Sequence, residues 1–209
     1  MDLQVRFLGV SGFQLSKGGS SILIDPFGKR AGDVDGDFVY CTHNHSDHTS
    51  GVPAFMERNP DAMLVTNHEV AKKFQKYEER IFTANDGESY NHGDWTLEFI
   101  KGKHGIFDNL NLMVVVRNEG ESFGHCGDSV TLEGFYTNKV DVLAIPILGL
   151  LTTSPRSAIE EVEKFEAPLP VVVPMHWMLR SPQEFCKNFS ERFPQAKCIV
   201  PVQGEILPL

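Results

Sequence analysis

Short apolar runs separated by glycines fill the first part of the chain. Val5 to Leu8, Phe13 to Ser16 and Ser21 to Asp25 have the length and composition of strands. The glycines between them predict an antiparallel meander. The run from Phe38 to Thr42, rich in β-prone residues, predicts a further strand. The pattern therefore indicates a sheet-rich N-terminal part.

Helix signals appear between the later strands. The predicted helices cover residues 51–58, 68–77, 155–166 and 182–193. Asn67 is the expected N-cap of the second. Ser154-Pro155 and Ser181-Pro182 each place a capping serine before a proline at the first helical position, which marks the start of the last two helices.

The second half of the chain repeats this plan. The further predicted strands cover residues 62–66, 95–101, 112–117, 121–126, 141–146, 170–174 and 197–202. Periodicity alone supports a mixed α/β or α+β fold and no finer class. No Ser/Gly/Pro-rich linker divides the chain, so residues 1–209 are expected to form a single domain.

Residues 42–48, Thr-His-Asn-His-Ser-Asp-His, bring four potential metal ligands together in one short segment. On an extended chain residues i and i+2 point the same way, so His43 and His45 can chelate one cation. Asp47 and His48 are adjacent and are better assigned to a second cation. Imidazole and carboxylate donors suit zinc best, and manganese or iron less well. The alternative is a polar surface loop that happens to contain three histidines.

This motif closely resembles the His-x-His-x-Asp-His signature of the metallo-β-lactamase superfamily, including Thr42 before the first histidine. The resemblance covers the whole chain. It implies an α+β fold, a four-layer αββα sandwich with the metal site at one edge of the two sheets. The segment from Ser21 to Pro26 is similar to the family's strand that ends in Asp, so Asp25 is expected to support the ligands.

The resemblance also implies the remaining ligands. His104 is similar to the family's third histidine, the Gly127-Asp128 pair to the one whose carboxylate bridges both ions, and His176 to the final histidine. His125, His68 and His92 are not expected to be ligands. The implied ligand set is His43, His45, Asp47, His48, His104, Asp128 and His176.

Two departures from common family patterns indicate which branch of the superfamily the chain resembles. Lys103-His104-Gly105-Ile106 differs from the Gly-His-Thr-Pro-Gly of the glyoxalase-like members, so the chain is closer to the small stand-alone lactonase-like branch, which includes ascorbate-phosphate lactonases. Val10 stands where that branch usually has a histidine. The role of that histidine is therefore absent or supplied by another residue.

The resemblance implies a dinuclear metal-dependent hydrolase. Two divalent ions, zinc first, would share a hydroxide that attacks a small ester, lactone or similar carbonyl substrate. Asp47 is the best candidate to help move a proton, and Asp128 is the bridging carboxylate. The alternatives are a phosphodiesterase or nuclease, an iron-dependent redox enzyme on the same fold, and a metal-stabilised protein without activity.

Charge and composition constrain the partners. The net charge is −9 and no basic face is visible, which argues against nucleic acid. No apolar run reaches the about 20 residues of a membrane span, and no signal peptide is visible, so a cytoplasmic protein is expected. The expected partner is a small-molecule substrate, and a homo-oligomer stays open.

Two smaller expectations concern the substrate and the cysteines. The expected pocket takes a small anionic substrate. Lys29 and Arg30 are the candidates for its cationic rim, and Phe107 and Trp177 for its apolar walls. The alternative for Lys29 and Arg30 is that they are ordinary loop charges.

The cysteines are scattered without a Cys-x-x-Cys pair, so all are expected to be reduced core residues. They are Cys41, Cys126, Cys186 and Cys198.

Overall fold

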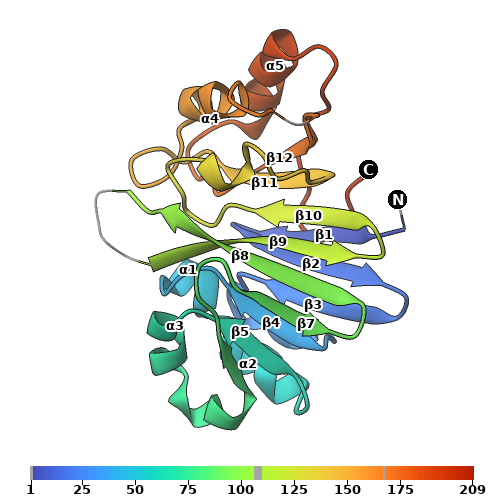
Figure 1. Ribbon diagram of the computed structural model, residues 1–209, viewed down its shortest axis with the longest axis vertical. Coiled ribbons are helices and arrows are strands. Elements are labelled where there is room, and N and C mark those ends of the chain that lie inside the picture. The colour runs from blue at the N-terminus through green and yellow to red at the C-terminus, as the bar shows by residue number, and fades with distance from the viewer. Residues whose placement is uncertain (1, 106–109, 167) are drawn as a thin grey trace. The chain divides into compact units, whose positions relative to one another are not determined.

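The computed structural model describes residues 2–105, 110–166 and 168–209 (Figure 1). Its contacts divide the chain into two compact units. The first comprises Met1–Asn85 and Val202–Leu207, and the second comprises Asp86–Pro201 and Pro208–Leu209. The expectation of a single domain over residues 1–209 stays a prediction.

The first unit is built on a six-stranded mixed sheet in which the strands follow chain order. Its strands are β1 (Gln4–Gly9), β2 (Gly12–Lys17), β3 (Ser20–Ile24), β4 (Phe38–Cys41), β5 (Met63–Thr66) and β6 (Ile81–Thr83). The first three pair antiparallel, which confirms the predicted meander. The last three run parallel to β3, so their carboxyl ends lie at one edge of the sheet.

Helices of the first unit connect the parallel strands. They are α1 (Ser46–Thr49), α2 (Val52–Arg58), α3 (His68–Lys73) and the 3-10 helices η1 (Lys29–Asp33) and η2 (Gln75–Arg80). A core cluster is formed by sheet residues such as Val39 and Leu64 with Phe55 of α2 and Val70 of α3. All four residues of β4 are buried, as expected for a strand covered on both faces.

The second unit repeats this architecture with a second mixed sheet, again in chain order. Its strands are β7 (Ser89–His92), β8 (Trp95–Lys103), β9 (Leu110–Asn118), β10 (Glu121–His125), β11 (Val142–Pro146) and β12 (Val171–Met175). The strands from β7 to β10 pair antiparallel. In contrast, β10, β11 and β12 are parallel, which again brings carboxyl ends to one edge.

The helices of the second unit are η3 (Glu133–Phe135), α4 (Pro155–Val162) and α5 (Pro182–Arg192), and α4 and α5 lie side by side (Figure 1). Both α-helices begin at the predicted serine caps. The Ser154 side chain accepts a hydrogen bond from the Ser157 amide, and the Ser181 hydroxyl accepts one from the Glu184 amide at 3.1 Å. The helix predicted to reach Glu166 ends at Val162.

In the described part of the chain, no helix combines the length and apolar character that a membrane crossing requires.

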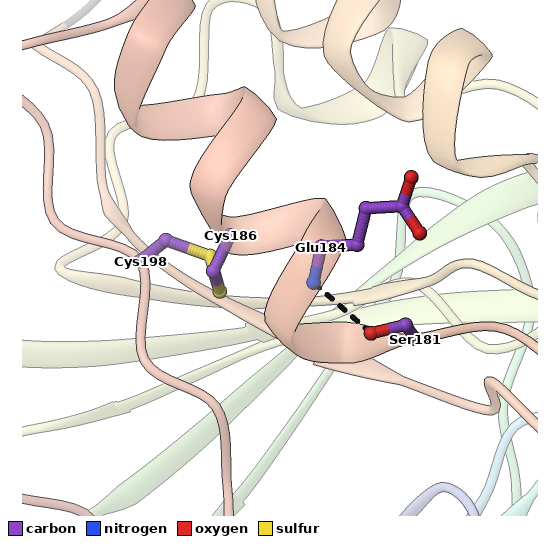
Figure 2. Close-up of a disulfide and its surroundings, with 4 residues drawn as sticks. All are labelled: Ser181, Glu184, Cys186 and Cys198. Carbon is purple, nitrogen blue, oxygen red and sulfur yellow. Dashed lines mark hydrogen bonds between the residues drawn. A yellow bond between two sulfur atoms is a disulfide. The ribbon is translucent and has the colours of Figure 1, made fainter.

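Two predictions about the C-terminal region are wrong. Residues 197–202 do not form a strand, because only Cys198 makes an isolated bridge, to Val172, and Pro201 has no amide hydrogen to donate to a sheet. Cys186 and Cys198 are not reduced but form a disulfide between α5 and the segment after it (Figure 2). Their Cα atoms are 5.3 Å apart, within the range that a disulfide spans.

Candidate functional site

The segment with four potential ligands leaves the carboxyl end of β4. His43 lies two residues beyond Cys41, and His45 has extended backbone angles as the residue before α1. Asp47 and His48 lie within α1, which is a single short helical turn. His43 and His48 are fully buried, whereas His45 and Asp47 are partly exposed.

The structure brings these four side chains together, and we call them the N-terminal cluster (His43, His45, Asp47 and His48). The ring centroid of His43 lies 4.6 Å from that of His45 and 4.1 Å from that of His48. A carboxylate oxygen of Asp47 lies 4.0 Å from Nε2 of His48. His43 and His45 offer ligand atoms within 4.8 Å of each other. Such spacing suits the chelation of a cation.

Asp25 orients this cluster from a buried position just after β3. Its carboxylate accepts hydrogen bonds from the amide and the hydroxyl of Thr42, both at 2.8 Å, and its Oδ2 lies 2.6 Å from Nδ1 of His48. Because Nδ1 of His48 is the nitrogen that bonds Asp25, Nε2 is the nitrogen suited to bind a metal. The expected supporting role of Asp25 therefore has a geometric basis.

Thr42 extends the influence of Asp25 to the tautomer of His43. Its hydroxyl donates its single hydrogen to Asp25, so at 3.0 Å from Nδ1 of His43 it acts as an acceptor. His43 then carries its hydrogen on Nδ1 and has Nε2 as its metal-binding nitrogen. Thus one buried carboxylate sets the tautomers of two histidines, one directly and one through a threonine.

Two further anchors of this segment were missed in the sequence. Asn67 caps α3 as predicted, but its side-chain amide also donates to the carbonyl oxygen of Thr42 at 3.0 Å. Lys73 donates to the hydroxyl of Thr49 at 2.7 Å, and Thr49 in turn donates to the carbonyl oxygen of His45 at 2.8 Å. The capping pattern identified Asn67, but no local signal points from α3 to the ligand segment.

The second unit holds three more predicted ligands, which we call the C-terminal cluster (His104, Asp128 and His176). His104 directly follows β8, Asp128 lies in the turn between β10 and β11, and His176 directly follows β12. All three are buried, with exposed fractions of 2%, 4% and 4%. Oδ2 of Asp128 lies 3.7 Å from Nε2 of His104 and 3.6 Å from Nε2 of His176. One carboxylate oxygen therefore lies close to both histidines.

The other histidines belong to neither cluster. His125 is fully buried at the end of β10, and its Nδ1 accepts a hydrogen bond from the Gly127 amide at 3.1 Å. His68 is exposed at the start of α3. His92 is the partly exposed last residue of β7, just before the turn that begins at Gly93.

The donor chemistry fits a divalent metal. Histidine nitrogen and carboxylate oxygen are the donors in both clusters, and zinc accepts both readily. Cys41 and Cys126 are fully buried, and burial raises the pKa of both thiols well above its ordinary value. Among the described side chains, the groups close enough together to hold an ion contain histidine and aspartate, so the nitrogen and oxygen donors form the better candidate set.

The remaining sequence candidates are placed as follows. Lys29 and Arg30 are exposed on η1, and Trp177 is half-buried in the turn after β12. Phe107 lies outside the described residues. Val10 has a left-handed backbone in the turn between β1 and β2, with φ of 54°. Ser11, which follows it, places its hydroxyl oxygen 3.1 Å from Nδ1 of His48.

Comparisons with known proteins agree with this architecture. A UPF0173 metal-dependent hydrolase from Sulfurisphaera tokodaii is 28% identical over 223 residues, which cover 96% of this chain and 98% of that protein. The structure of Igni18, a metallo hydrolase from Ignicoccus hospitalis, matches with a TM-score of 0.83 at 23% identity over 98% of this chain and 97% of that one. The metallo-beta-lactamase fold protein YhfI from Bacillus subtilis matches with a TM-score of 0.81 at 15% identity over 98% of each chain.

These likenesses confirm the expected fold class. The two mixed six-stranded sheets with flanking helices are those of the metallo-β-lactamase fold. A family profile described as the beta-lactamase superfamily domain matches residues 4–176, a range that includes both the N-terminal and the C-terminal cluster. On this match, the chain belongs to the beta-lactamase superfamily.

Proposed function

We propose that this protein is a dinuclear metal-dependent hydrolase of the small stand-alone, lactonase-like type, which cleaves a small ester, lactone or similar carbonyl substrate. The name of the Sulfurisphaera tokodaii relative, a metal-dependent hydrolase, supports the reaction class. The donor chemistry of the two clusters supports the metal requirement. Zinc is the proposed metal, because histidine and carboxylate donors suit it best.

The observation that carries the proposal is the position of Asp128 between two histidines. Two ligands bound to one tetrahedral zinc ion at about 2.0–2.2 Å lie about 3.4 Å from each other. Oδ2 of Asp128 lies 3.7 Å from Nε2 of His104 and 3.6 Å from Nε2 of His176, close to that separation on both sides. An ionised carboxylate has about four lone-pair sites, so Asp128 can serve two ions at once.

The proposed ligand assignment follows. His43, His45, His104 and Asp128 hold one ion, and Asp47, His48, His176 and Asp128 hold the other. Bound together, two divalent ions would acidify a shared water towards a pKa of about 7 and polarise the substrate carbonyl. In this assignment, the chain itself orients the ligands, through Asp25 and Thr42 on the N-terminal side.

Asp47 is proposed to move the proton. Its side chain is 36% exposed, whereas His48 beside it is fully buried. An exposed carboxylate can exchange a proton with solvent, although coordination to a metal lowers its basicity. Asp47 thus combines the role of ligand with that of proton carrier, while Asp128 stays a buried bridging ligand.

The proposed substrate is small, with an anionic and an apolar part. Lys29 and Arg30 are exposed and available to an anionic group. Three large apolar side chains are exposed on the loops after β11 and β12 and support the apolar part, namely Leu150, Met178 and Leu179. The first of these loops contacts the second, because the Arg180 side chain donates to the carbonyl oxygen of Leu148 at 3.1 Å.

Metal analysis tests the metal part of the proposal. Protein reconstituted with zinc should carry close to two equivalents per chain, and Asp128→Ala should lose at least one ion and nearly all activity. Asp141→Ala is a matched control, because Asp141 is a carboxylate in the same unit that bonds Ser122 instead of a histidine. Two retained ions and an unchanged rate in Asp128→Ala would contradict the bridging assignment.

A substrate panel tests the reaction class. Zinc-loaded and manganese-loaded protein should cleave lactones or simple esters faster than cyclic phosphodiesters or short RNA. Activity on RNA without activity on carboxylic esters would instead favour the phosphodiesterase alternative. Oxygen consumption by iron-loaded protein without any hydrolysis would favour the redox alternative.

The cationic rim has a separate test. The double variant Lys29→Ala with Arg30→Ala should raise the KM for anionic lactones and leave that for neutral ones unchanged. Lys72→Ala with Lys76→Ala, an exposed basic pair on α3 and η2, is the control. An unchanged KM for anionic lactones would remove the rim from the proposal without affecting the hydrolase assignment.

A further inference from the structure

We propose that Asn111 and Ser129 are positioning residues that fix the relative placement of His104 and Asp128 and thereby set the metal affinity of the C-terminal cluster. The inference rests on the proposed function, since it takes His104 and Asp128 as metal ligands. All the contacts that carry it lie within the second unit.

Ser129 joins the strand end that carries His104 to the turn that carries Asp128. Its side chain is fully buried, and it directly follows Asp128. The hydroxyl oxygen accepts hydrogen bonds from the amides of Lys103 at 3.1 Å and Thr131 at 3.3 Å. Its single hydrogen has two candidate acceptors, and the Thr131 carbonyl at 2.7 Å is closer than that of Lys103 at 3.3 Å.

The backbone reinforces this junction. The Val130 amide donates to the carbonyl oxygen of Lys103 at 2.7 Å. On the other side of the turn, the Thr153 amide donates to the carbonyl oxygen of Ser129 at 3.1 Å. The residue before His104 is therefore held by the two residues that follow Asp128, which ties one proposed ligand to the other.

Asn111 holds the same turn from the neighbouring strand. It lies on β9, opposite Gly102 of β8, and is fully buried. Its Oδ1 accepts a hydrogen bond from the Asp128 amide at 3.3 Å, and its Nδ2 donates to the carbonyl oxygen of Cys126 at 3.2 Å. The side-chain amide thus binds the turn on both sides of Gly127.

Gly102 makes room for both polar side chains. A Cβ atom at this position would lie 2.4 Å from Nδ2 of Asn111 and 3.2 Å from Oγ of Ser129. The first of these distances is shorter than any tolerable contact. Asn111 and Ser129 therefore approach the backbone of β8 directly, two residues before His104, and a side chain at Gly102 would push them away.

A metal ion binds tightly only when its ligand atoms lie close to their preferred positions. The bonds that Asn111 and Ser129 make are therefore relevant to metal affinity. Metal–ligand distances have to hold within about 0.2 Å of their preferred values. Groups that orient ligands from outside the coordination shell typically change metal affinity by about 10–100-fold when they are removed. The bonds from Asn111 and Ser129 restrain the backbone at Asp128 and at Lys103, next to His104, so their loss should act on metal affinity through position.

The competing explanation is that Asn111 and Ser129 only stabilise the fold. Matched variants distinguish this structural role from the proposed positioning role. Ser122 and Asn118 are buried polar residues on β10 and β9, at the strand ends away from Asp128 and His104. Ser122 also bonds a backbone segment, because its hydroxyl donates to Asp141 at 2.7 Å and accepts from the Asp141 amide at 3.0 Å. Ser122→Ala therefore removes a buried hydroxyl that bonds a backbone segment, and Asn118→Ala removes a buried amide of the same strand as Asn111, both at a distance along the strand from the cluster.

The experiment measures three quantities for wild type and the four alanine variants. They are the zinc dissociation constant by competition with a fluorescent chelator, the visible spectrum of cobalt-substituted protein, and the Tm of metal-free protein. Ser129→Ala and Asn111→Ala should raise the zinc dissociation constant by about tenfold or more and shift the cobalt spectrum. Ser122→Ala and Asn118→Ala should lower the Tm similarly and leave the other two quantities unchanged.

The outcomes are distinguishable. Ser129→Thr, which keeps the hydroxyl, should retain most of the zinc affinity. Unchanged zinc affinity in both Ser129→Ala and Asn111→Ala, or an equal loss in all four alanine variants, would overturn the positioning role and leave the proposed function intact. Failure of the wild type to bind zinc would overturn both. Asn111 and Ser129 are varied separately. If one variant folds poorly, the zinc affinity of the other still tests the positioning role.

Discussion

Oδ2 of Asp25 lies 2.6 Å from Nδ1 of His48, and both side chains are fully buried. The same carboxylate accepts the hydroxyl hydrogen of Thr42, which in turn faces Nδ1 of His43 at 3.0 Å. Asp25 thus determines which nitrogen of two histidines is available to a metal. The residue itself has a left-handed backbone, with φ of 45°, in the turn that follows β3.

Asp25→Asn should weaken zinc binding by about 10–100-fold. Asparagine tolerates the left-handed backbone, so the turn should persist. An amide, however, offers one acceptor oxygen in place of two and cannot satisfy both His48 and Thr42. Chelator competition measures the affinity. Asp37→Asn is the control, because Asp37 accepts hydrogen bonds from Ser21 and Ser20 away from the cluster. Equal zinc affinities in the two variants would contradict this role.

Glu161 should make the protein sensitive to acid. Burial pushes the pKa of this carboxyl up, but hydrogen bonds from Lys164, Tyr136, Leu132 and Thr131 outweigh burial and hold it below its ordinary value of 4.5. A lowered folded-state pKa stabilises the protein above the unfolded-state value and loses that contribution as the pH falls through the folded value. Unfolding should therefore become easier below about pH 4.5.

The variant Glu161→Gln isolates this contribution. At about pH 7 it should be less stable than wild type by about 1–3 kcal/mol, since it loses charge-assisted hydrogen bonds, and the difference should shrink as the pH falls. Urea unfolding across the pH range measures it. Glu160→Gln is the matched control, because Glu160 is exposed and pairs with Arg156 on the same helix. A difference that stays constant with pH would argue against the lowered pKa.

The disulfide should contribute measurably to stability. Cys186 and Cys198 are separated by 12 positions, and a loop of this size corresponds to about 3 kcal/mol in the chain-entropy account. The double variant Cys186→Ser with Cys198→Ser should lose about that amount in urea unfolding. Reductant should destabilise wild type to the same degree and leave the double variant unchanged. Equal stability of oxidised and reduced wild type would show that the bond contributes nothing.

Local patterns in the sequence predicted the parts of the structure that local chemistry determines. The caps at Ser154 and Ser181 begin their helices as expected. Four potential ligands within residues 43–48 are close in space because they are close in the chain. The placement of His104, Asp128 and His176 needed the family resemblance, since no periodicity relates residues that end three different strands or turns.

Long-range contacts account for what the sequence missed. The Leu207 amide donates to the carbonyl oxygen of Val5 at 2.8 Å, so the end of the chain pairs with β1, which no local pattern in the sequence predicted. Thr131 bonds Glu161 across 30 residues. Such pairings depend on the finished fold, and apolar periodicity reports only on which face of an element is buried.

His104 and His125 offer a direct comparison within one unit. Both are buried, but Nε2 of His104 lies 3.7 Å from Asp128, whereas Nδ1 of His125 accepts a hydrogen bond from the Gly127 amide at 3.1 Å. His104→Ala should therefore lower zinc content and cut turnover by orders of magnitude, with a smaller effect on the metal-free fold. His125→Ala should keep the zinc and lower stability by about 1–3 kcal/mol, because it leaves a buried amide without its acceptor.

Metal analysis and urea unfolding of metal-free protein measure both effects in the same preparations. A loss of zinc in His125→Ala together with full zinc content in His104→Ala would assign the ligand to His125 and contradict the proposed ligand set. Loss of zinc in both variants without loss of stability in either would contradict the structural role of His125. Because both side chains are histidines sheltered from water, the two variants compare the effect of a carboxylate neighbour with that of a backbone amide.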